Sequence, residues 1–282
     1  MSKYIIDVSK HNGKINLSKA QKYIDGLVAR CSYGWTSSNV DEQWENNASQ
    51  ANALGIPLFA YHFCYATNES EAKKEAQLAV DTCKNYNVNV IYYDMEYTDT
   101  QGNLTNEMYY KIAKTFCDYI ESKGYSVGIY ANQDWFKNRL TNEGFSKWTL
   151  WLANYGKNNG YDNWNGKLKY NPFGHVLLHQ FTSNAKKGVL KGIEGINSEG
   201  LDCSLDYGLL ETFSKHKSSN DFNIGDKVKV KANSKWYDGQ SIASFVFKNE
   251  YEIIQIRGDR VVIGKNNKVT GAIALKNLIK AQ

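Results

Sequence analysis

The stretch Val88 to Thr98, VNVIYYDMEYT, decides how this chain is interpreted. It is a run of β-forming apolar residues that ends at one acid and reaches a second acid two positions later. Because side chains alternate between the faces of a strand, Asp94 and Glu96 are expected to point the same way, with Tyr92 behind them. Two carboxyls whose Cα atoms lie about 6 to 7 Å apart raise the pKa of at least one. Such a carboxyl can act as a general acid near neutral pH, although two solvated acids at a strand end are the alternative.

Predicted strands and helices alternate on both sides of this stretch. Apolar runs typical of strands are found at residues 3–9, 27–33, 56–65, 125–131, 149–154 and 175–181. Segments typical of helices are found at residues 17–24, 41–54, 68–86, 105–123 and 133–140. This rhythm over roughly 200 residues predicts an α/β fold with a parallel sheet and helical crossovers, most economically a (β/α) barrel. The connections after Leu140 are rich in Gly and Asn, so we expect an irregular second half of the barrel.

Acids and an amide fall at the ends of several predicted strands. Asp7, Asp94, Glu96 and Asn154 lie at carboxyl-terminal ends, and Asp202 follows the last predicted strand. In (β/α) barrels these ends meet at one rim, where catalytic groups are found. Acids without a shared function would be spread over loops and helices. The pattern therefore favours a carboxylate-based active site over a set of solvated strand ends.

The composition is that of an ordinary globular protein, with 42% hydrophobic and 22% charged residues. No apolar run approaches the ~20 residues of a membrane span. The 20 Tyr and 7 Trp suit the stacking of sugars or bases, although a Tyr-rich core would need the same composition. The five cysteines include no CxxC pair and the five histidines no metal-binding spacing, so we expect free thiols and neither metal nor cofactor. His62, inside the apolar run LFAYHFCY, is expected to be a hydrogen-bonded core residue.

The last quarter of the chain has a different pattern. Residues 214–220, SKHKSSN, have the composition of a linker, and short period-2 runs split by turn signals at 238–239 and 257–259 follow it. About 60 residues of this kind predict a small all-β barrel. Residues 221–282 hold 11 of the 34 Lys+Arg and 6 of the 29 Asp+Glu. The first 220 residues therefore have 23 basic and 23 acidic side chains, whose charges cancel. The net charge of +5 is carried by residues 221–282. Such a domain could bind nucleic acid, but its lysines alternate with valines and lack interleaved aromatics, which favours an anionic cell wall.

Six segments in order along the chain carry a family resemblance. They are IDVSKHNG from Ile6, AYHF from Ala60, YYDME from Tyr92, LWLANYG from Leu150, HQFTS from His179 and GLDCSLDYG from Gly200. Together, over about residues 1 to 212, they resemble glycoside hydrolase family 25, the N-acetylmuramidases or Chalaropsis-type lysozymes that are common in phage endolysins. The resemblance implies an irregular barrel and cleavage of the β-1,4 bond after N-acetylmuramic acid in peptidoglycan.

Carried over by position, Glu96 matches the family's general acid and Asp94 its partner carboxylate, while Asp7 and Asp202 match the flanking acids. Candidate substrate-binding residues are the polar or aromatic side chains expected near the same rim: Tyr33, Tyr61, Tyr92, Tyr130, Trp151, Asn154 and Gln180. Tyr61, Tyr130 and Trp151 would serve equally well as core residues. The chain departs from the family pattern at Tyr33, where Glu or Gln usually precedes the Gly, and at His179-Gln180, where Trp-Gln is usual. Both positions are expected to face the substrate.

The C-terminal segment resembles a bacterial SH3 (SH3b) wall-binding domain in KVKVKANSKWYDGQSI and in the closing ALKNLI. We therefore expect a catalytic barrel at 1–213, a linker at 214–220 and an SH3b-like cell-wall-binding domain at 221–282. The first residues, MSKYIIDVSK, place Asp7 where a signal peptide would need apolar residues. We expect synthesis in the host bacterial cytoplasm without a signal peptide, and action on the cell wall after release. The expected partners are peptidoglycan and a cell-wall polymer, without nucleic acid or membrane, and a monomer is the default state.

Two rival functions fit the sequence less well. A chitinase-like strand would end in DxxDxDxE, but when it is aligned on Asp94 and Glu96 its first two acids fall on Asn89 and Tyr92. A wall-binding lectin on an inactive barrel would have lost or replaced the acids, and all of them are present. The sequence therefore predicts a modular muramidase.

Overall fold

The computed structural model describes residues 2–214, 222–257, 260–265 and 268–281. The chain divides into two compact units, Met1–Ser214 and Lys215–Gln282. Apart from Ser214, the linker predicted at 214–220 lies outside the described residues. No helix in the described ranges is long and apolar enough to cross a membrane.

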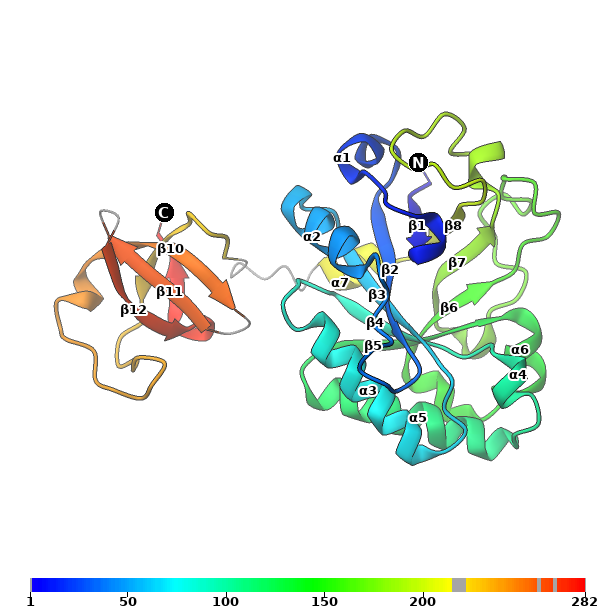
Figure 1. Cartoon of the computed structure of the whole chain (residues 1–282), viewed down its shortest axis with the longest axis horizontal. Coiled ribbons are helices and arrows are strands. Elements are labelled where there is room, and N and C mark those ends of the chain that lie inside the picture. Colours follow the sequence, from blue (N-terminus) through cyan, green and yellow to red (C-terminus); the bar gives the residue numbers. More distant parts are fainter. Residues whose placement is uncertain (1, 215–221, 258–259, 266–267, 282) are drawn as a thin grey trace. The chain divides into compact units, whose positions relative to one another are not determined.

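The first unit is a closed eight-stranded barrel in which the strands follow one another in chain order (Figure 1). Its strands are β1 Tyr4–Val8, β2 Gly26–Tyr33, β3 Leu58–Phe63, β4 Val90–Asp94, β5 Ser126–Asn132, β6 Thr149–Ala153, β7 Val176–Thr182 and β8 Asp202–Asp206. Strands β1 to β7 are parallel, as predicted. The sequence analysis predicted no strand at 202–206, which was wrong, because β8 lies there and closes the barrel by pairing antiparallel with both β7 and β1.

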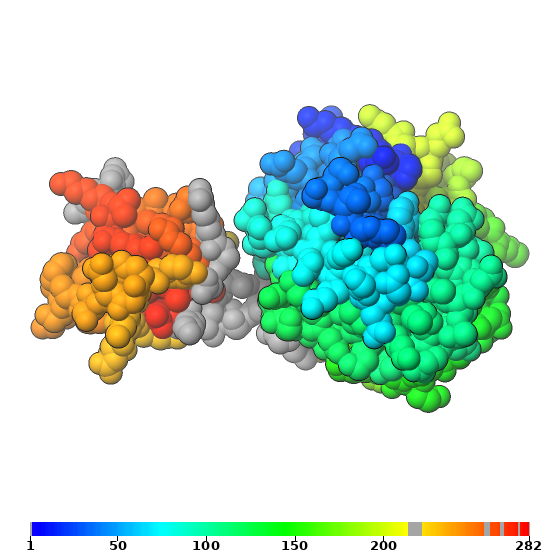
Figure 2. Space-filling view, turned by 60° about the horizontal axis from the view of Figure 1, so that its bottom comes forward, coloured from blue at the N-terminus to red at the C-terminus, as the bar shows by residue number. Residues whose placement is uncertain are grey.

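Helices cover the first half of the barrel far more than the second. They are α1 Leu17–Ala20, α2 Trp44–Leu54, α3 Glu69–Cys83, α4 Thr98–Gln101, α5 Asn106–Ser122, α6 Gln133–Asn138 and α7 Leu209–Ser214. The connections from β5 to β8 hold, besides α6, only the 3-10 turns η3 Glu143–Lys147, η4 Pro172–Gly174 and η5 Ala185–Lys187; η1 Lys10–Asn12 and η2 Gln21–Tyr23 lie earlier. The predicted irregular second half is confirmed. In Figure 2 the cyan residues of the helical half, which include those of α3, form one continuous surface.

Helix α5 illustrates how the sequence specifies these elements. The Thr105 side chain accepts a hydrogen bond from the Met108 N–H at 3.2 Å, which satisfies one of the free N–H groups of the first turn. Ile112, Phe116 and other residues at helical spacing are buried against the sheet and α3. Gly124, with φ of +84°, takes the left-handed conformation that ends the helix.

The barrel unit has two apolar layers. One lies between the strands and the helices, where Tyr93 of β4 stacks on Phe116 of α5 with ring centroids 3.8 Å apart. The other fills the barrel interior and includes Val28, Phe59 and Tyr92. The interior is therefore a packed core, which leaves the mouth of the barrel as the place for a cavity.

The second unit is a five-stranded antiparallel sheet in the order β12-β11-β10-β9-β13. Its strands are β9 Lys227–Val230, β10 Glu250–Arg257, β11 Arg260–Lys265, β12 Lys268–Ala274 and β13 Leu278–Lys280, with the 3-10 turns η6 Val246–Lys248 and η7 Leu275–Asn277. Along β9, exposed lysines alternate with buried valines, as predicted. Gly239, with φ of +86°, confirms one predicted turn, and the turn residues 258–259 lie outside the described residues. Within the described ranges β12 and β13 do not pair, so the expected closure into a barrel is not observed.

Candidate active site

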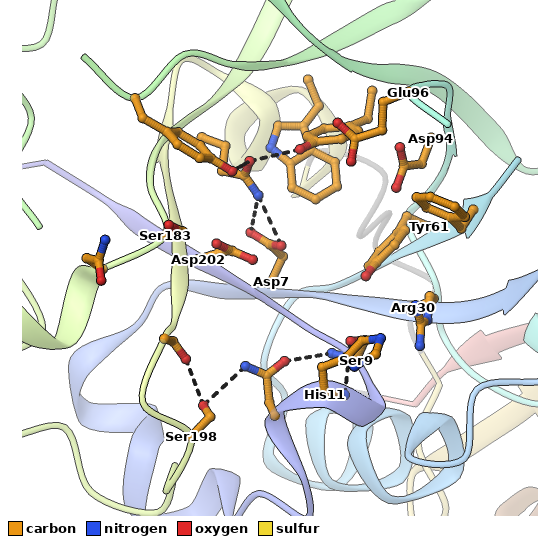
Figure 3. Close-up of a pocket in the computed structure, with 18 of the residues that line it drawn as sticks. Asp7, Ser9, His11, Arg30, Tyr61, Asp94, Glu96, Ser183, Ser198 and Asp202 are labelled. Atoms are coloured by element: carbon orange, nitrogen blue, oxygen red, sulfur yellow. Dashed lines mark hydrogen bonds between the residues drawn. The ribbon is translucent and has the colours of Figure 1, made fainter. Parts of the chain in front are cut away.

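A cavity of about 770 Å³ opens at the carboxyl-terminal mouth of the barrel. Its lining includes all of the predicted catalytic acids: Asp7 from β1, Asp94 and Glu96 from the end of β4 and the residues after it, and Asp202 from β8. Figure 3 shows Asp7 beside Asp202, and Asp94 beside Glu96. Acids from three separate parts of the chain therefore converge on one site.

The direction of β8 explains why Asp202 belongs to this mouth. Asp202 pairs with Asp7 in the antiparallel register of β8 and β1. Because β8 runs opposite to the other strands, its first residue lies where their last residues lie. Asp202 was expected to follow the last strand; it begins a strand that the sequence analysis missed, yet it lies at the predicted rim.

Gln180 organises the centre of the site. Its Nε2 donates to both carboxylate oxygens of Asp7, at 3.1 and 3.0 Å, and its Oε1 accepts from the hydroxyls of Tyr130 at 2.9 Å and Tyr155 at 2.7 Å. Burial and then the charge of Asp202 raise the pKa of Asp7 well above its usual range, and the Gln180 amide opposes that shift. The amide therefore holds the Asp7 carboxyl in one orientation.

Asp94 is 4% exposed, and its Oδ1 is buried without a hydrogen-bond partner among the described residues. Burial, followed by the charges of Glu96 and Asp7, raises the pKa of Asp94 well above its usual value, while Arg30 acts in the opposite direction. An unpartnered buried carboxyl oxygen costs free energy unless a ligand binds it. Asp94 is thus poised for contact with a substrate.

Arg30 is a cavity residue that the sequence analysis placed in a strand without giving it a role. Its Nε donates to Oδ2 of Asp41 at 2.7 Å, and both side chains are at least nine-tenths buried. Asp41 was expected to begin a helix. Its carboxylate instead binds Arg30 and accepts from the Gln43 N–H at 2.9 Å, so α2 begins at Trp44.

Glu96 lies just after β4 and is partly exposed to the cavity. Burial and then the charge of Asp202 raise its pKa to about 7, against a hydrogen bond with Asn132 that lowers it. Burial also raises the pKa of Asp202 to about 6. A carboxyl with a pKa near 7 retains a proton that it can donate at neutral pH.

Four of the seven predicted substrate-binding residues line the cavity: Tyr61, Tyr130, Trp151 and Gln180. Trp151 and Tyr130 are in ring contact with centroids 4.3 Å apart, and Tyr61 lies edge-on to Trp151 at 6.0 Å. The Trp151 indole N–H donates to the Ser204 hydroxyl at 3.0 Å, which fixes the orientation of the ring. These aromatic rings contribute an apolar surface beside the acids.

The other three do not line the cavity. Tyr92 is completely buried in the barrel interior, because its position on β4 lies one inward-facing step below Asp94. Asn154 turns toward Gln133, whose side-chain oxygen accepts a hydrogen bond from its amide. Tyr33 packs edge-on against Tyr65, with ring centroids 6.0 Å apart. The full burial of Tyr92 contradicts its predicted contact with a substrate. For Asn154 and Tyr33 that contact stays a prediction.

His179 also faces away from the cavity, contrary to expectation. Its Nε2 lies 3.0 Å from the carbonyl oxygen of Asn154, and its ring stacks on Trp164 at 5.2 Å. The departure from the family pattern at this position therefore changes a contact outside the cavity, while its neighbour Gln180 points inside.

Sequence reasoning missed several cavity residues that lie in loops or at strand ends, among them Phe63, Tyr65, Tyr155, His11, Asn12, Ser198 and Glu199. The Asn12 amide donates to the Ser198 hydroxyl at 3.2 Å, which ties the turn after β1 to the loop before β8. Phe63 and Tyr65 are two positions apart at the end of a predicted strand, and this alternation could have placed both on the cavity face. No local sequence pattern could have predicted the contact between residues 12 and 198.

Two predictions are confirmed: His62 is a hydrogen-bonded core residue, and the thiols are free. His62 is fully buried, and its Nδ1 lies 2.8 Å from the Ser32 hydroxyl. All five cysteines are free and buried. In the described ranges, no group of three or more His, Cys, Asp or Glu side chains could hold a metal ion.

Residues 6–189 match the family "Glycosyl hydrolases family 25". The modular autolysin LytC from Streptococcus pneumoniae, solved in complex with a synthetic peptidoglycan ligand, is 27% identical with a TM-score of 0.59, over 72% of this chain and 46% of LytC. The catalytic domain of endolysin ply40 from bacteriophage P40 of Listeria monocytogenes is 23% identical with a TM-score of 0.59, over 76% of this chain and 97% of that domain.

A bacterial lysozyme from Streptomyces coelicolor is 17% identical with a TM-score of 0.62, over 76% of this chain and 95% of the lysozyme. Of the LytC chain, less than half is covered by this chain. No match was found among curated proteins.

Proposed function

The chain belongs to glycosyl hydrolases family 25, and we propose that it hydrolyses the β-1,4 bond between N-acetylmuramic acid and N-acetylglucosamine in bacterial peptidoglycan. The observation that carries this proposal is the convergence of Asp7, Asp94, Glu96 and Asp202 in one cavity, with the pKa of Glu96 raised to about 7. The similarity to LytC, which was solved with a peptidoglycan ligand, supports the substrate class.

Glu96 is the general acid in this proposal. Its raised pKa leaves it protonated in part of the population at neutral pH. It would transfer that proton to the glycosidic oxygen as the bond breaks, so that the leaving sugar departs as a neutral alcohol.

Asp94 acts in its ionised form beside the anomeric carbon. Positive charge develops there in the oxocarbenium-like transition state, and a buried carboxylate stabilises it strongly in a low-dielectric site. As the glycosidic bond breaks, either Asp94 itself attacks this carbon or it orients the 2-acetamido group of the substrate, whose oxygen attacks. Water then displaces the attacking group, and Glu96, now deprotonated, takes up the proton of that water. Arg30 favours the ionised form of Asp94 against its other neighbours.

Asp7, near the end of β1, and Asp202, at the start of β8, act on Asp94 and Glu96 through their charges. The charge of Asp202 contributes to the raised pKa of Glu96, and Asp7 contributes to that of Asp94. The hydrogen bonds from Gln180 keep Asp7 in place. Their role is to set the protonation state of the reacting carboxyls.

The C-terminal unit is proposed to retain the enzyme on the wall as an SH3b-like domain at 221–282, behind a linker at 214–220. The support is its net charge of +5 and the exposed lysines Lys227 and Lys229 on β9. An anionic wall polymer would attract this charge, and binding there would raise the local concentration of the barrel at its substrate.

The catalytic assignment is tested with Glu96→Gln on purified peptidoglycan. The isosteric amide cannot supply a proton, and general acid catalysis is typically worth about 10² to 10⁴ in rate, so release of reducing ends should fall by that factor. Glu69→Gln, at an exposed acid in the first turn of α3, is the matched control and should retain full activity. Retention of more than about a tenth of the activity by Glu96→Gln would contradict the assignment.

A further inference from the structure

Four half-buried aromatic residues form a cluster at the mouth of the barrel, which we call the aromatic wall: Tyr33, Phe63, Tyr65 and Tyr97. Tyr65 and Tyr97 are stacked with centroids 4.9 Å apart, and Phe63 lies 5.7 Å from Tyr65 and 5.5 Å from Tyr97. Tyr33 completes the cluster edge-on to Tyr65 at 6.0 Å. All four residues keep part of their surface exposed, unlike the fully buried aromatic residues of the core.

The aromatic wall begins next to the proposed reacting carboxyls. Phe63 and Tyr65 line the same cavity as Asp94 and Glu96. Phe63 pairs with Asp94 in the register of β3 and β4, and Tyr97 directly follows Glu96. A glycan strand that places its scissile bond at the carboxyls therefore has this surface within reach of a neighbouring sugar.

Buried side chains hold the loops of the wall in place. Glu75 of α3 is fully buried, and its Oε1 accepts from the Tyr65 backbone N–H at 2.8 Å. Gln101, the last residue of the short helix α4 that directly follows Tyr97, donates from its side-chain amide to the carbonyl oxygen of Ala66 at 2.7 Å. A surface held in this way loses little conformational entropy on binding.

The backbone after β2 also lies against the wall. Gly34 has φ of +53°, and a Cβ at this position would come within 3.0 Å of Cδ2 of Tyr65, so only glycine permits this approach. The loop that follows carries Trp35 and Val40, each 37% exposed. They are two of the three exposed large apolar side chains in the described part of the barrel unit, the third being Tyr161.

We propose that the aromatic wall is a subsite on which a pyranose ring of the bound glycan strand stacks, adjacent to the sugars at the scissile bond. The C–H face of a pyranose is apolar and covers exposed aromatic surface, while its equatorial hydroxyls remain in water. The proposal rests on the proposed function, because the occupant is another sugar of the same strand. Peptide binding is the competing outcome of the test.

The test measures binding to the full-length protein carrying Glu96→Gln, so that ligands are not consumed. Peptidoglycan glycans of two, four and six sugars, each with and without stem peptides, are titrated by calorimetry into this reference protein and into the same protein with Tyr65→Ala. We expect Tyr65→Ala to weaken binding of the longer glycans by about 5-fold, the size of one lost aromatic contact, and to leave the two-sugar ligand unaffected. Tyr65→Phe keeps the ring and should bind all three glycans like the reference protein.

The outcomes separate the subsite from the proposed function. Equal affinities of the reference and Tyr65→Ala proteins for every glycan would overturn the subsite alone. The subsite would also be overturned if affinity fell only for glycans that carry stem peptides, or if it fell equally for all lengths. Failure of the reference protein to bind any glycan would contradict the proposed function, and the subsite with it.

Discussion

Asp7 and Asp202 are paired in the antiparallel register of the first and last strands of the barrel, so the closure of the sheet itself brings two carboxyls together. Both are mostly buried, and both have raised pKa values, that of Asp202 to about 6. The pairing of β1 with β8 therefore places the charge of Asp202 where it raises the pKa of Asp7.

The first prediction concerns the pH dependence of activity. Because the charge of Asp202 helps to raise the pKa of Glu96 to about 7, Asp202→Asn should lower that pKa. The alkaline limb of the kcat/KM profile, where the general acid loses its proton, should move to lower pH. A variant whose alkaline limb coincides with that of the wild type would show that Asp202 does not act on Glu96.

The second prediction concerns stability. A carboxyl whose pKa is raised by folding binds more protons in the folded state than in the unfolded state. Its contribution to the free energy of unfolding is therefore full below the unfolded pKa of about 4. That contribution is lost as the pH rises through the folded pKa, which is about 6 for Asp202 and about 7 for Glu96. Asp202→Asn should therefore raise the melting temperature relative to wild type at pH 8 more than at pH 5. Thermal unfolding at the two pH values measures this, and an equal change at both would contradict it.

The third prediction concerns Arg30. Its charge opposes the raised pKa of Asp94, so Arg30→Gln should move the acidic limb of the pH–activity profile to higher pH, whereas Arg30→Lys should move it less. Arg30→Gln also leaves Asp41 buried without its partner, at a cost of about 3–5 kcal/mol in the free energy of unfolding.

The double variant Arg30→Gln/Asp41→Asn separates the two effects of Arg30. It removes the unpaired buried charge and should regain stability, but it should keep the shifted acidic limb. If the acidic limb returned to its wild-type position in the double variant, Arg30 would be acting only through the fold.

The fourth prediction concerns the C-terminal unit. Removing residues 215–282 should leave a folded barrel, because the first unit has its own core. The truncated enzyme should lose more activity on whole cells than on soluble glycan fragments, and the isolated C-terminal unit should bind cells in a partly salt-sensitive manner. Equal losses on both substrates would make the unit part of the catalytic fold, and binding to DNA without binding to cells would favour a nucleic-acid-binding role.

The positions of the acids at strand ends were predictable from two periodicities: the alternation of side chains along a strand, and the alternation of strands and helices along the chain. Asp7, Asp94 and Glu96 end or follow buried parallel strands, and the mouth of a barrel gathers such ends. Tyr92 was assigned wrongly because alternation gives the face of a residue but not its depth in the barrel. A residue two positions before a cavity residue shares its face and still lies in the core.

Strand β8 and the aromatic wall could not be predicted from local patterns. Strand β8 is short and follows a long connection whose only regular element is a 3-10 turn. The alternation of strands and helices therefore does not predict it. The wall joins Tyr33, Tyr65 and Tyr97 from three separate loops or strand ends, and only tertiary contacts such as that of Glu75 with the Tyr65 backbone bring them together.

The most direct test of the proposed function identifies the bond that is cut. Purified peptidoglycan is digested with the full-length protein, reduced with borohydride and analysed by mass spectrometry. A muramidase should produce new reducing ends that appear as N-acetylmuramitol, and Glu96→Gln should lower their yield by about 10² to 10⁴. New N-acetylglucosaminitol ends, or released peptides without new reducing ends, would contradict the proposed function.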